Sequence, residues 1–276
     1  MGENMVVYVG RDLDRVLVLL DFSELVKAKK IVVKINMVSP TTILSMTPPD
    51  SVDRLLHFLR NKLGYTGDII IAEGSAGDTW VGFRRGGFDK IAKKYGAELF
   101  DIHDDDYYLV KIFDSEFNKF SIPISRLLVD SEALISICRA KTHDTVVVTL
   151  SIKNVAVGGI VGVDNRPKIH QGYQAININI AILGAIMYPN ISIVDGRLGM
   201  QGNGPVFGYE KEWGYVFCGI SPLHVDSIVA EAMGFNPKDI GYIYYLEKLG
   251  FGKIDKAKIH GFSLEEIRTK FEPHLT

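Results

Sequence analysis

The chain has 276 residues, of which 47% are hydrophobic and 23% are charged, and its formal net charge is −2. This is the composition of a globular protein, and the length allows one large domain or two lobes that share a cleft. A near-neutral chain without a basic stripe is not expected to bind nucleic acid, because contacts with the phosphate backbone require an excess of lysine and arginine.

The cysteine content and the apolar runs narrow the class further. Only two cysteines are present, Cys138 and Cys218, which excludes a disulfide framework, a four-cysteine zinc site and a self-contained iron–sulfur cluster. No apolar run reaches the ~20 residues needed to cross a bilayer, and the N-terminal segment lacks the charge order and cleavage site of a signal peptide. We therefore expect a cytoplasmic protein without a membrane partner.

The first hundred residues alternate between apolar runs of strand type and amphipathic segments of helix type. Strands are predicted at residues 6–9, 30–36, 68–72 and 97–101, and helices at 12–22, 52–63 and 88–95. This alternation predicts an α/β fold with a mainly parallel sheet flanked by helices.

The second part of the chain continues this pattern after a change at residues 103–124, where polar and aromatic residues predict a hairpin or an edge extension. The predicted strands are 133–137, 146–152, 191–194, 215–219 and 256–260, the helices are 176–187, 223–233, 237–249 and 264–271, and a long glycine-rich loop is predicted at 199–214. We expect a single domain over residues 1–276, with a change of lobe near 103–130 as the alternative.

Polar residues gather where several predicted strands end. In open parallel sheets, ligands bind beyond the carboxyl ends of the strands, where loops and helix N-termini converge. The polar strand ends are Lys34 and Asn36, then Glu73, Gly74 and Ser75, then Lys153 and Asn154, and finally Asp195. A single polar strand end is expected in any protein, but several of them together predict a cleft for a small anionic or phosphorylated ligand.

Two lysine-containing clusters bracket the strand predicted at 146–152. Lys141, Thr142 and His143 precede it, and Lys153 and Asn154 follow it. Unpaired buried cations are costly, so we expect these lysines either to be neutralised by carboxylates or to receive an anionic ligand. Because a seven-residue strand is ~23 Å long, the two clusters share one site only if this run bends or is not a single strand.

Three further segments are candidates for ligand contact. The small residues of 73–79, which include Asp78 and Thr79, would let backbone N–H groups cradle a phosphate; the alternative is a tight turn with Asp78 capping the next helix. Asp195 and Asp226 are placed to orient the cations or to hold a metal, although Asp226 also fits a helix N-terminal charge. The stretch 197–205 is either a lid or an ordinary surface connection.

Several of these segments resemble the domain-of-unknown-function-362 family, in the right order and over about residues 31–240. The matching segments are Val33–Asn36, Ala72–Thr79, Lys141–His143, Ser151–Asn154, Val194–Gly196 with Gly202–Pro205, and Val225–Asp226. Many members carry a ferredoxin-like cluster domain, and this chain lacks the cysteines for one. The resemblance therefore implies a related fold and site, without the electron-transfer role of such a cluster.

The chain is also similar, more weakly, to lactate-racemase-type enzymes. In these a histidine, a lysine that tethers a nickel-pincer nucleotide, and a later histidine follow one another, and His143, Lys153 and His170 occur here in that order. This similarity implies His143 and His170 as ligands of a divalent metal. The glycine-rich residues around the family's lysine are absent.

The favoured hypothesis is an α/β enzyme in which Lys141 and Lys153 supply charge, His143 transfers protons, and Asp195 orients these groups or helps to bind a metal. The alternative is a non-catalytic accessory protein that binds a ligand or metal in a redox or cofactor pathway. The apolar helix predicted at 176–187 faces either the core or a second copy of the chain. Substrate, reaction and metal identity are not predicted.

Overall fold

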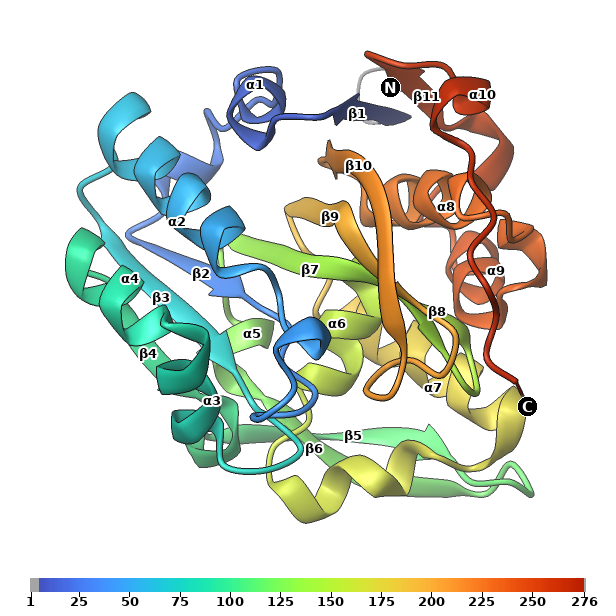
Figure 1. The fold of residues 1–276 in the computed structure, drawn as a ribbon. Coiled ribbons are helices and arrows are strands. Elements are labelled where there is room, and N and C mark those ends of the chain that lie inside the picture. The colour runs from blue at the N-terminus through green and yellow to red at the C-terminus, as the bar shows by residue number, and fades with distance from the viewer. Residues whose placement is uncertain (1–4, 276) are drawn as a thin grey trace.

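The computed structural model describes residues 5–275, so the ends of the predicted domain, residues 1–4 and 276, lie outside the described part. A nine-stranded sheet has the order β11-β1-β10-β9-β7-β2-β3-β4, with β8 paired to β7 (Figure 1). Its strands are β1 Val6–Gly10, β2 Lys30–Lys34, β3 Asp68–Glu73, β4 Glu98–Asp101, β7 Leu134–His143, β8 Val147–Thr149, β9 Ile191–Gln201, β10 Tyr209–Gly219 and β11 Lys258–His260. Strands β9, β7, β2, β3 and β4 are mutually parallel, which confirms the predicted α/β fold.

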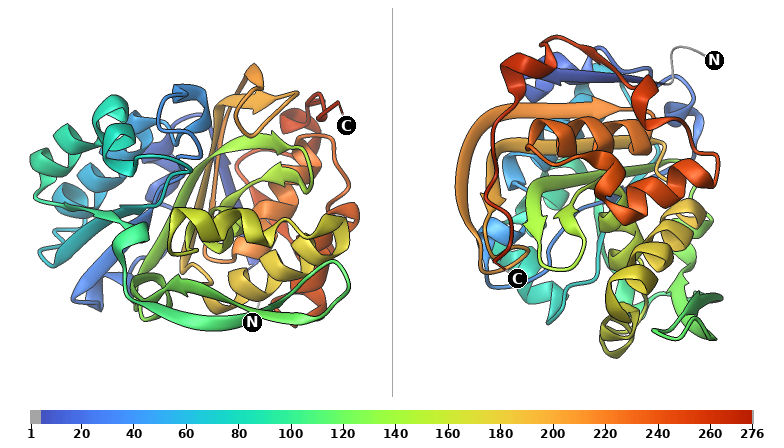
Figure 2. Two further views of the ribbon diagram at one scale, coloured as in Figure 1. Left: turned by 90° about the horizontal axis from the view of Figure 1, so that it is seen from below. Right: turned by 90° about the vertical axis from the view of Figure 1, so that its right-hand side faces the viewer.

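Helices cover both faces of this sheet (Figure 2). One face carries α1 Leu13–Leu17, α2 Pro49–His57, α3 Thr79–Gly86 and α4 Phe88–Tyr95, and the other carries α5 Arg126–Val129, α6 Ser151–Gly158, α7 Gly172–Ile186, α8 Pro222–Ala232, α9 Gly241–Lys248 and α10 Leu264–Ile267. Short 3₁₀ turns occupy Leu25–Lys27, Ile43–Ser45, Ile102–Asp104, Val163–Ile169, Pro237–Asp239 and Ile254–Lys256, and a π-helical turn extends α2 over Phe58–Lys62. Strand β2 shows the reason for two cores, because Ile31 and Val33 face one helix layer while Val32 faces the other.

A separate two-stranded sheet, β5 Tyr107–Phe113 and β6 Lys119–Ser125, forms the predicted hairpin. It lies along α7, where the Asn179 side chain accepts a hydrogen bond from the Phe113 N–H group at 2.9 Å and donates one to the Phe113 carbonyl at 2.8 Å. The hairpin occupies the region in which a change of lobe was the alternative. The single-domain organisation stays a prediction.

The prediction of one strand over residues 146–152 is wrong. Only Val147–Thr149 is a strand, and it turns back antiparallel on β7, so that Lys141 pairs in register with Thr149. Helix α6 begins at Ser151 inside the apolar run, because the Asp226 carboxylate accepts the first N–H groups of that helix. The two lysine clusters therefore do not lie at opposite ends of one strand.

The loop predicted at 199–214 is also mostly strand, because β9 extends to Gln201 and β10 begins at Tyr209. Two glycines in β9 make room for aromatic rings instead of marking a loop. A Cβ atom on Gly196 would lie 2.5 Å from the Trp213 ring, and one on Gly199 would lie 2.8 Å from the Phe271 ring. Asp195 is consequently inside a strand and not at its end.

Other differences concern the helices. The prediction missed α3, which is separated from α4 by Gly87 with a φ of 72°. Helices α1 and α10 are shorter than predicted, and the segment beginning at Pro237 is a 3₁₀ turn followed by α9. The apolar helix α7 packs against α6 and α9, in agreement with the core-facing alternative, while self-association stays a prediction.

Within residues 5–275, no helix is both long and apolar enough to cross a membrane. Cys138 and Cys218 are free thiols, and both are buried. Burial raises the pKa of both thiols, so they are unreactive core residues. The predicted cytoplasmic location stays a prediction.

Candidate functional site

A cavity of about 440 Å³ opens beside the carboxyl ends of β2, β3 and β7. Six of the predicted site residues line it: Asn36, Glu73, His143, Lys153, Asn154 and His170. Much of the remaining wall is apolar and comes from Val38, Ala76, Val157, Val163, Pro167 and Pro205. The structure therefore brings together polar groups that are scattered over 135 residues of sequence, from position 36 to position 170.

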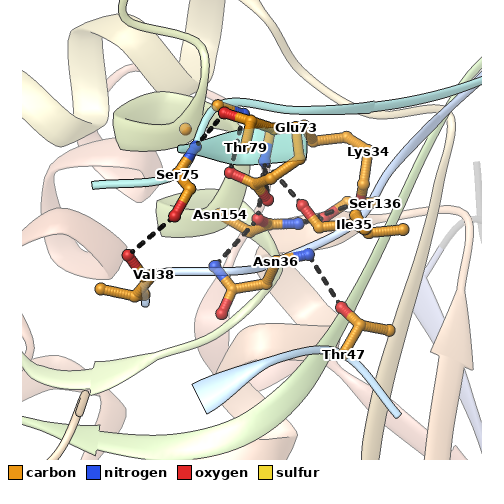
Figure 3. Close-up of polar contacts among 12 residues, drawn as sticks. Lys34, Ile35, Asn36, Val38, Thr47, Glu73, Ser75, Thr79, Ser136 and Asn154 are labelled. Carbon is orange, nitrogen blue, oxygen red and sulfur yellow. Dashed lines mark hydrogen bonds and ion pairs between the residues drawn. The ribbon is translucent and has the colours of Figure 1, made fainter. Parts of the chain in front are cut away.

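Lys34 is at the centre of a network of buried polar groups next to this cavity (Figure 3). Its Nζ donates to the Glu73 carboxylate at 2.8 Å, to the Asn154 side-chain oxygen at 3.1 Å and to the Ile35 carbonyl at 2.6 Å. An ammonium group has three donors, so all of them are used. Burial lowers the pKa of Lys34, and the charge of Glu73 opposes that shift. This lysine is a paired structural cation.

Asn154, on α6, links that helix to the strand ends in Figure 3. Its amide group donates to the Lys34 carbonyl and to the Ser136 hydroxyl, each at 3.1 Å. Its oxygen also accepts from the Asn36 amide at 3.2 Å. Asn154 thus uses its donors and its acceptor within the protein, and it fixes α6 across β2 and β7.

Lys141 joins the same network but does not line the cavity. Its Nζ donates to the Asn36 side-chain oxygen and, at 2.6 Å, to the Ser45 carbonyl. Neither acceptor is charged, and burial lowers the pKa of Lys141 to about 7. Its neighbour Thr142 donates to the Gly202 carbonyl at 2.9 Å and so holds the β9–β10 loop against β7.

Lys153 differs from both of these lysines. It lies in the first turn of α6 and lines the cavity, and only 6% of its surface is exposed. Among the described residues it has no hydrogen-bond acceptor and no ion-pair partner for its ammonium group. Burial lowers the pKa of Lys153 to about 8, Asp144 opposes this shift, and the charge of Arg166 adds to it. An unpaired cation that is almost fully buried beside a cavity favours an anionic ligand or the neutral amine.

His143, the last residue of β7, is 4% exposed and lies on the cavity wall. Its Nδ1 is 2.7 Å from the Asp144 carboxylate, and the N–H groups of Thr145 and Val146 are directed at it from 3.1 and 3.4 Å. The carboxylate contact and the two N–H contacts require opposite tautomers. We assign the proton to Nδ1, because a lone pair there would repel the carboxylate at the shortest of the three distances, the Thr145 N–H group has Asp144 as an acceptor at 2.6 Å, and the Val146 contact is the longest.

This assignment leaves Nε2 of His143 with a free lone pair. Nε2 has no hydrogen-bond partner within residues 5–275. Burial and the nearby Lys153 charge lower the pKa of His143 to about 3, so the imidazole is neutral at physiological pH. The hairpin turn that carries it is strained, since Val147 has a φ of 68°, which is rare for a β-branched residue.

Arg166 is a cavity residue that the sequence reasoning missed. Its Nη2 lies 3.6 Å from the Glu73 carboxylate and donates to the Gly158 carbonyl at 3.3 Å, whereas its buried Nε has no partner in the described part of the chain. Burial lowers the pKa of Arg166, although arginine stays charged. A lone arginine in a short turn before Pro167 carries no sequence signal that would have identified it.

His170 lines the cavity after the turn Val163–Ile169 and is more exposed than His143. Burial lowers the pKa of His170, with a further contribution from the Lys153 charge. Residues 5–275 contain no group of three or more histidine, cysteine, aspartate or glutamate side chains arranged to hold a metal ion. A metal held by His143 and His170 therefore stays a prediction, with two protein ligands.

Asp195 and Asp226 do not reach the cavity. Asp195 accepts from the guanidinium and backbone N–H groups of Arg197, at 2.6 and 2.9 Å, and from the Ser51 hydroxyl. Asp226 accepts from the N–H groups of Ser151 at 3.0 Å and Ile152 at 2.9 Å, and burial raises its pKa to about 7. Both carboxylates hold elements of the scaffold together.

Three N–H groups of the turn after β3, where an anion cradle was predicted, already have acceptors within the protein, and an anion cradle there stays a prediction. The Gly74 N–H group donates to the Glu73 side chain at 3.0 Å, that of Ser75 to the Thr79 hydroxyl at 3.1 Å, and that of residue 76 to the Val38 carbonyl at 3.0 Å. Asp78 is exposed and caps α3 by accepting from the Val81 N–H group at 2.8 Å. The alternative, a tight turn with Asp78 as a helix cap, is therefore the observed structure.

The β9–β10 loop, residues 202–208, contains the end of the predicted lid. Pro205 contributes to the cavity wall, and the loop is held on one side by Thr142. On its other side the Gly202 N–H group donates to the Glu272 carbonyl at 2.8 Å. The loop thus completes the wall, while movement as a lid stays a prediction.

Comparisons with known proteins agree with this architecture. The model of a family described as a domain of unknown function, DUF362, matches residues 31–231. A thylakoid-associated protein of Synechocystis is 22% identical over 129 residues, which are 46% of this chain and 40% of that protein. The lactate racemase apoprotein of Thermoanaerobacterium thermosaccharolyticum has a similar fold, with a TM-score of 0.50 and 11% identity over 91% of this chain and 58% of that one. The chain thus spans less than two thirds of each protein.

Proposed function

The chain belongs to the family of the domain of unknown function DUF362, and from this premise we propose that it is an enzyme that binds a small anionic or phosphorylated ligand in the cavity beside β2, β3 and β7. The ligand is held by Lys153 and Arg166, and His143 transfers a proton to or from it. The observation that carries this proposal is the buried ammonium group of Lys153, which lines the cavity without a partner among the described residues.

The partners of the charged groups support an anion. The cavity wall holds the cations Lys153 and Arg166 together with the carboxylates of Glu73, Asp144 and Asp164. Glu73 is engaged by Lys34 at 2.8 Å, and Asp164 is exposed to solvent. A bound anion would offset the remaining positive charge and supply acceptors for donors that have none.

His143 has the features of a proton-transfer group. Its Nδ1–H group is oriented by Asp144, and its Nε2 lone pair is available in the cavity. A neutral imidazole that is held in one tautomer acts as a general base and then, once protonated, as a general acid. Asp195, which the sequence analysis assigned to catalysis, has no part in this proposal because it is bonded to Arg197 and Ser51.

The second candidate is a non-catalytic binding protein, in which the same cations hold a ligand without turnover. The observation in its favour is the low pKa of His143, near 3, which makes this imidazole a weak base. A ligand anion beside it would raise that pKa by charge attraction. The two candidates therefore differ in what His143 does once the ligand is bound.

Binding of inorganic phosphate and dihydroxyacetone phosphate, measured by calorimetry and by thermal shift, tests the proposal. Replacing Lys153→Met or Arg166→Gln removes a charge-assisted contact, so affinity should fall about 10- to 100-fold. The exposed Lys168, which donates to Asn165 at 2.7 Å, provides the control K168A, which should bind normally. Unchanged affinity in both K153M and R166Q would contradict an anion site in this cavity.

The variant His143→Ala separates enzyme from binding protein. If the protein is an enzyme, H143A should keep most of its affinity but exchange ligand protons with deuterated solvent at least 100-fold more slowly, the usual contribution of a positioned acid or base. Exchange is followed by NMR on the bound probe. Equal exchange in H143A and the wild type would favour the non-catalytic candidate.

A further inference from the structure

The cavity is divided between a polar end and an apolar wall. Lys153 and Arg166 both line it, and the positive charge of Arg166 contributes to the lowered pKa of Lys153. Val157 and Val163 lie on the apolar part of the wall. A ligand that fills such a cavity has one anionic group and a less polar body.

Arg166 is the better anion anchor of the two cations. Of its three guanidinium nitrogens, only Nη2 contacts an acceptor within residues 5–275, and the Nε donor is buried without one. Guanidinium keeps its charge when buried, and its donors match the oxygens of a carboxylate or a phosphate. An anion on Arg166 would leave the amine of Lys153 facing the body of the ligand.

We propose that Lys153 is a nucleophile that forms an imine with an aldehyde or ketone whose phosphate or carboxylate group is held by Arg166. This inference rests on the proposed function and names its ligand as an anionic carbonyl compound. It accounts for the fact that Lys153 has no counter-ion in the described structure, since a carboxylate partner would keep its nitrogen protonated. With a pKa of about 8, a useful fraction of Lys153 is the free amine near neutral pH.

The reaction balances without an oxidant or a reductant. The Nζ lone pair of Lys153 attacks the carbonyl carbon and forms the C–N bond, while the C=O π pair moves to oxygen. Nε2 of His143 carries one of the two nitrogen protons to that oxygen, which becomes a hydroxyl group. Nε2 then passes a proton from solvent to the hydroxyl group, which leaves as water while the nitrogen lone pair forms the C=N bond. One amine, one carbonyl compound and one solvent proton give one protonated imine and one water. The protonated imine then withdraws electrons from the neighbouring carbon, whose C–H bond becomes acidic.

Reductive trapping tests this reaction on the full-length protein. The protein is incubated with dihydroxyacetone phosphate and sodium cyanoborohydride near pH 8, and the adduct is located by intact mass and peptide mapping. Dihydroxyacetone is the matched probe, because it presents the same ketone without the phosphate. Levulinate and 2-pentanone form a second matched pair, which distinguishes a carboxylate from a phosphate ligand.

We expect one adduct per chain, on Lys153, formed at least tenfold faster with an anionic probe than with its neutral partner. K153M should abolish it, R166Q should remove the preference for the anionic probe, R166K should restore part of that preference, and the surface variant K168A should react normally. Adducts spread over surface lysines, or equal labelling of K153M, would overturn the inference. Anion binding without trapping would overturn the imine and leave the proposed function standing, whereas the absence of anion binding would overturn both.

Discussion

Lys34 and Lys153 are both buried lysines of one polar region, but their ammonium groups have opposite surroundings. Lys34 donates to three acceptors, one of them the Glu73 carboxylate, and it is fully enclosed. Lys153 has no acceptor among the described residues, although it is buried to nearly the same extent. The first arrangement stabilises the fold and leaves nothing for a ligand to add. The second destabilises the protein alone and would be relieved by an anionic ligand, which is why we propose Lys153 and not Lys34 as the functional lysine.

The largest predicted effect is that of Lys34→Met. This change leaves the Glu73 carboxylate with the Gly74 N–H group and with the more distant cation of Arg166, at 3.6 Å, and it removes the Lys34 donor from the Asn154 oxygen. Breaking a buried ion pair from one side typically costs about 3–5 kcal/mol, so the free energy of unfolding should fall by that amount. Urea unfolding followed by circular dichroism measures it. A loss below 1 kcal/mol would mean that Lys34 is not a structural cation.

Lys153→Met should increase the free energy of unfolding, whereas Lys34→Met lowers it. The pKa of Lys153 falls from 10.5 in the unfolded chain to about 8 in the folded protein, so the folded state binds fewer protons between these values. At pH 7 both states are protonated, and the burial penalty is then about 3 kcal/mol. K153M should remove this penalty and stabilise the protein by up to that amount.

The pH dependence checks the origin of that gain. Wild-type stability should rise as the pH increases from about 8 to about 10.5, because the unfolded chain then holds the extra proton. The advantage of K153M should therefore be full below pH 8 and vanish near pH 10.5. The variant K168A, at an exposed lysine, should show no such trend relative to the wild type. If K153M were less stable than the wild type, Lys153 would be a structural residue like Lys34.

The surroundings of Lys34 could be predicted from the sequence better than those of Lys153. Lys34 and Glu73 are the last residues of β2 and β3, and Asn36 lies two residues beyond β2, so the alternation of strand and helix places them at one edge of the sheet. Local periodicity also predicted the parallel strands, of which β2 and β3 are buried runs rich in β-branched residues. These features depend on neighbours in the sequence.

The positions of Lys153, Gly196 and Arg166 depend on contacts between residues far apart in the sequence, which no local pattern contains. Helix α6 starts at Ser151 because Asp226 caps it from 75 residues away, and this start brings Lys153 to the cavity. Gly196 is in a strand because its missing side chain admits the Trp213 ring. Arg166 reaches the cavity only because the turn at Val163–Ile169 folds back over β3. Each of these positions is decided by tertiary packing.

Gly158→Ala tests how firmly the Lys34 network is packed. A Cβ atom at this position would lie 2.4 Å from the Lys34 Nζ and 2.8 Å from its Cε, and the three acceptors of Lys34 prevent it from moving aside. Such overpacking typically costs about 1–3 kcal/mol. The cost should largely disappear in the double variant with Lys34→Ala, because the clash is then gone. If the two effects simply add, the Lys34 ammonium is not what excludes a side chain at residue 158.

The smallest effect is expected at Asp78, a predicted ligand residue that the structure places at the exposed N-terminus of α3. Its carboxylate accepts from the Val81 N–H group at 2.8 Å, so Asp78→Ala should lower the free energy of unfolding by about 1 kcal/mol. Asp78→Asn retains a capping oxygen and should cost less. Phosphate affinity should be unchanged in both variants, because Asp78 does not line the cavity. Tighter phosphate binding in D78A and D78N alike would show that the negative charge acts on the ligand, and it would extend the functional region from Lys153 to the turn after β3.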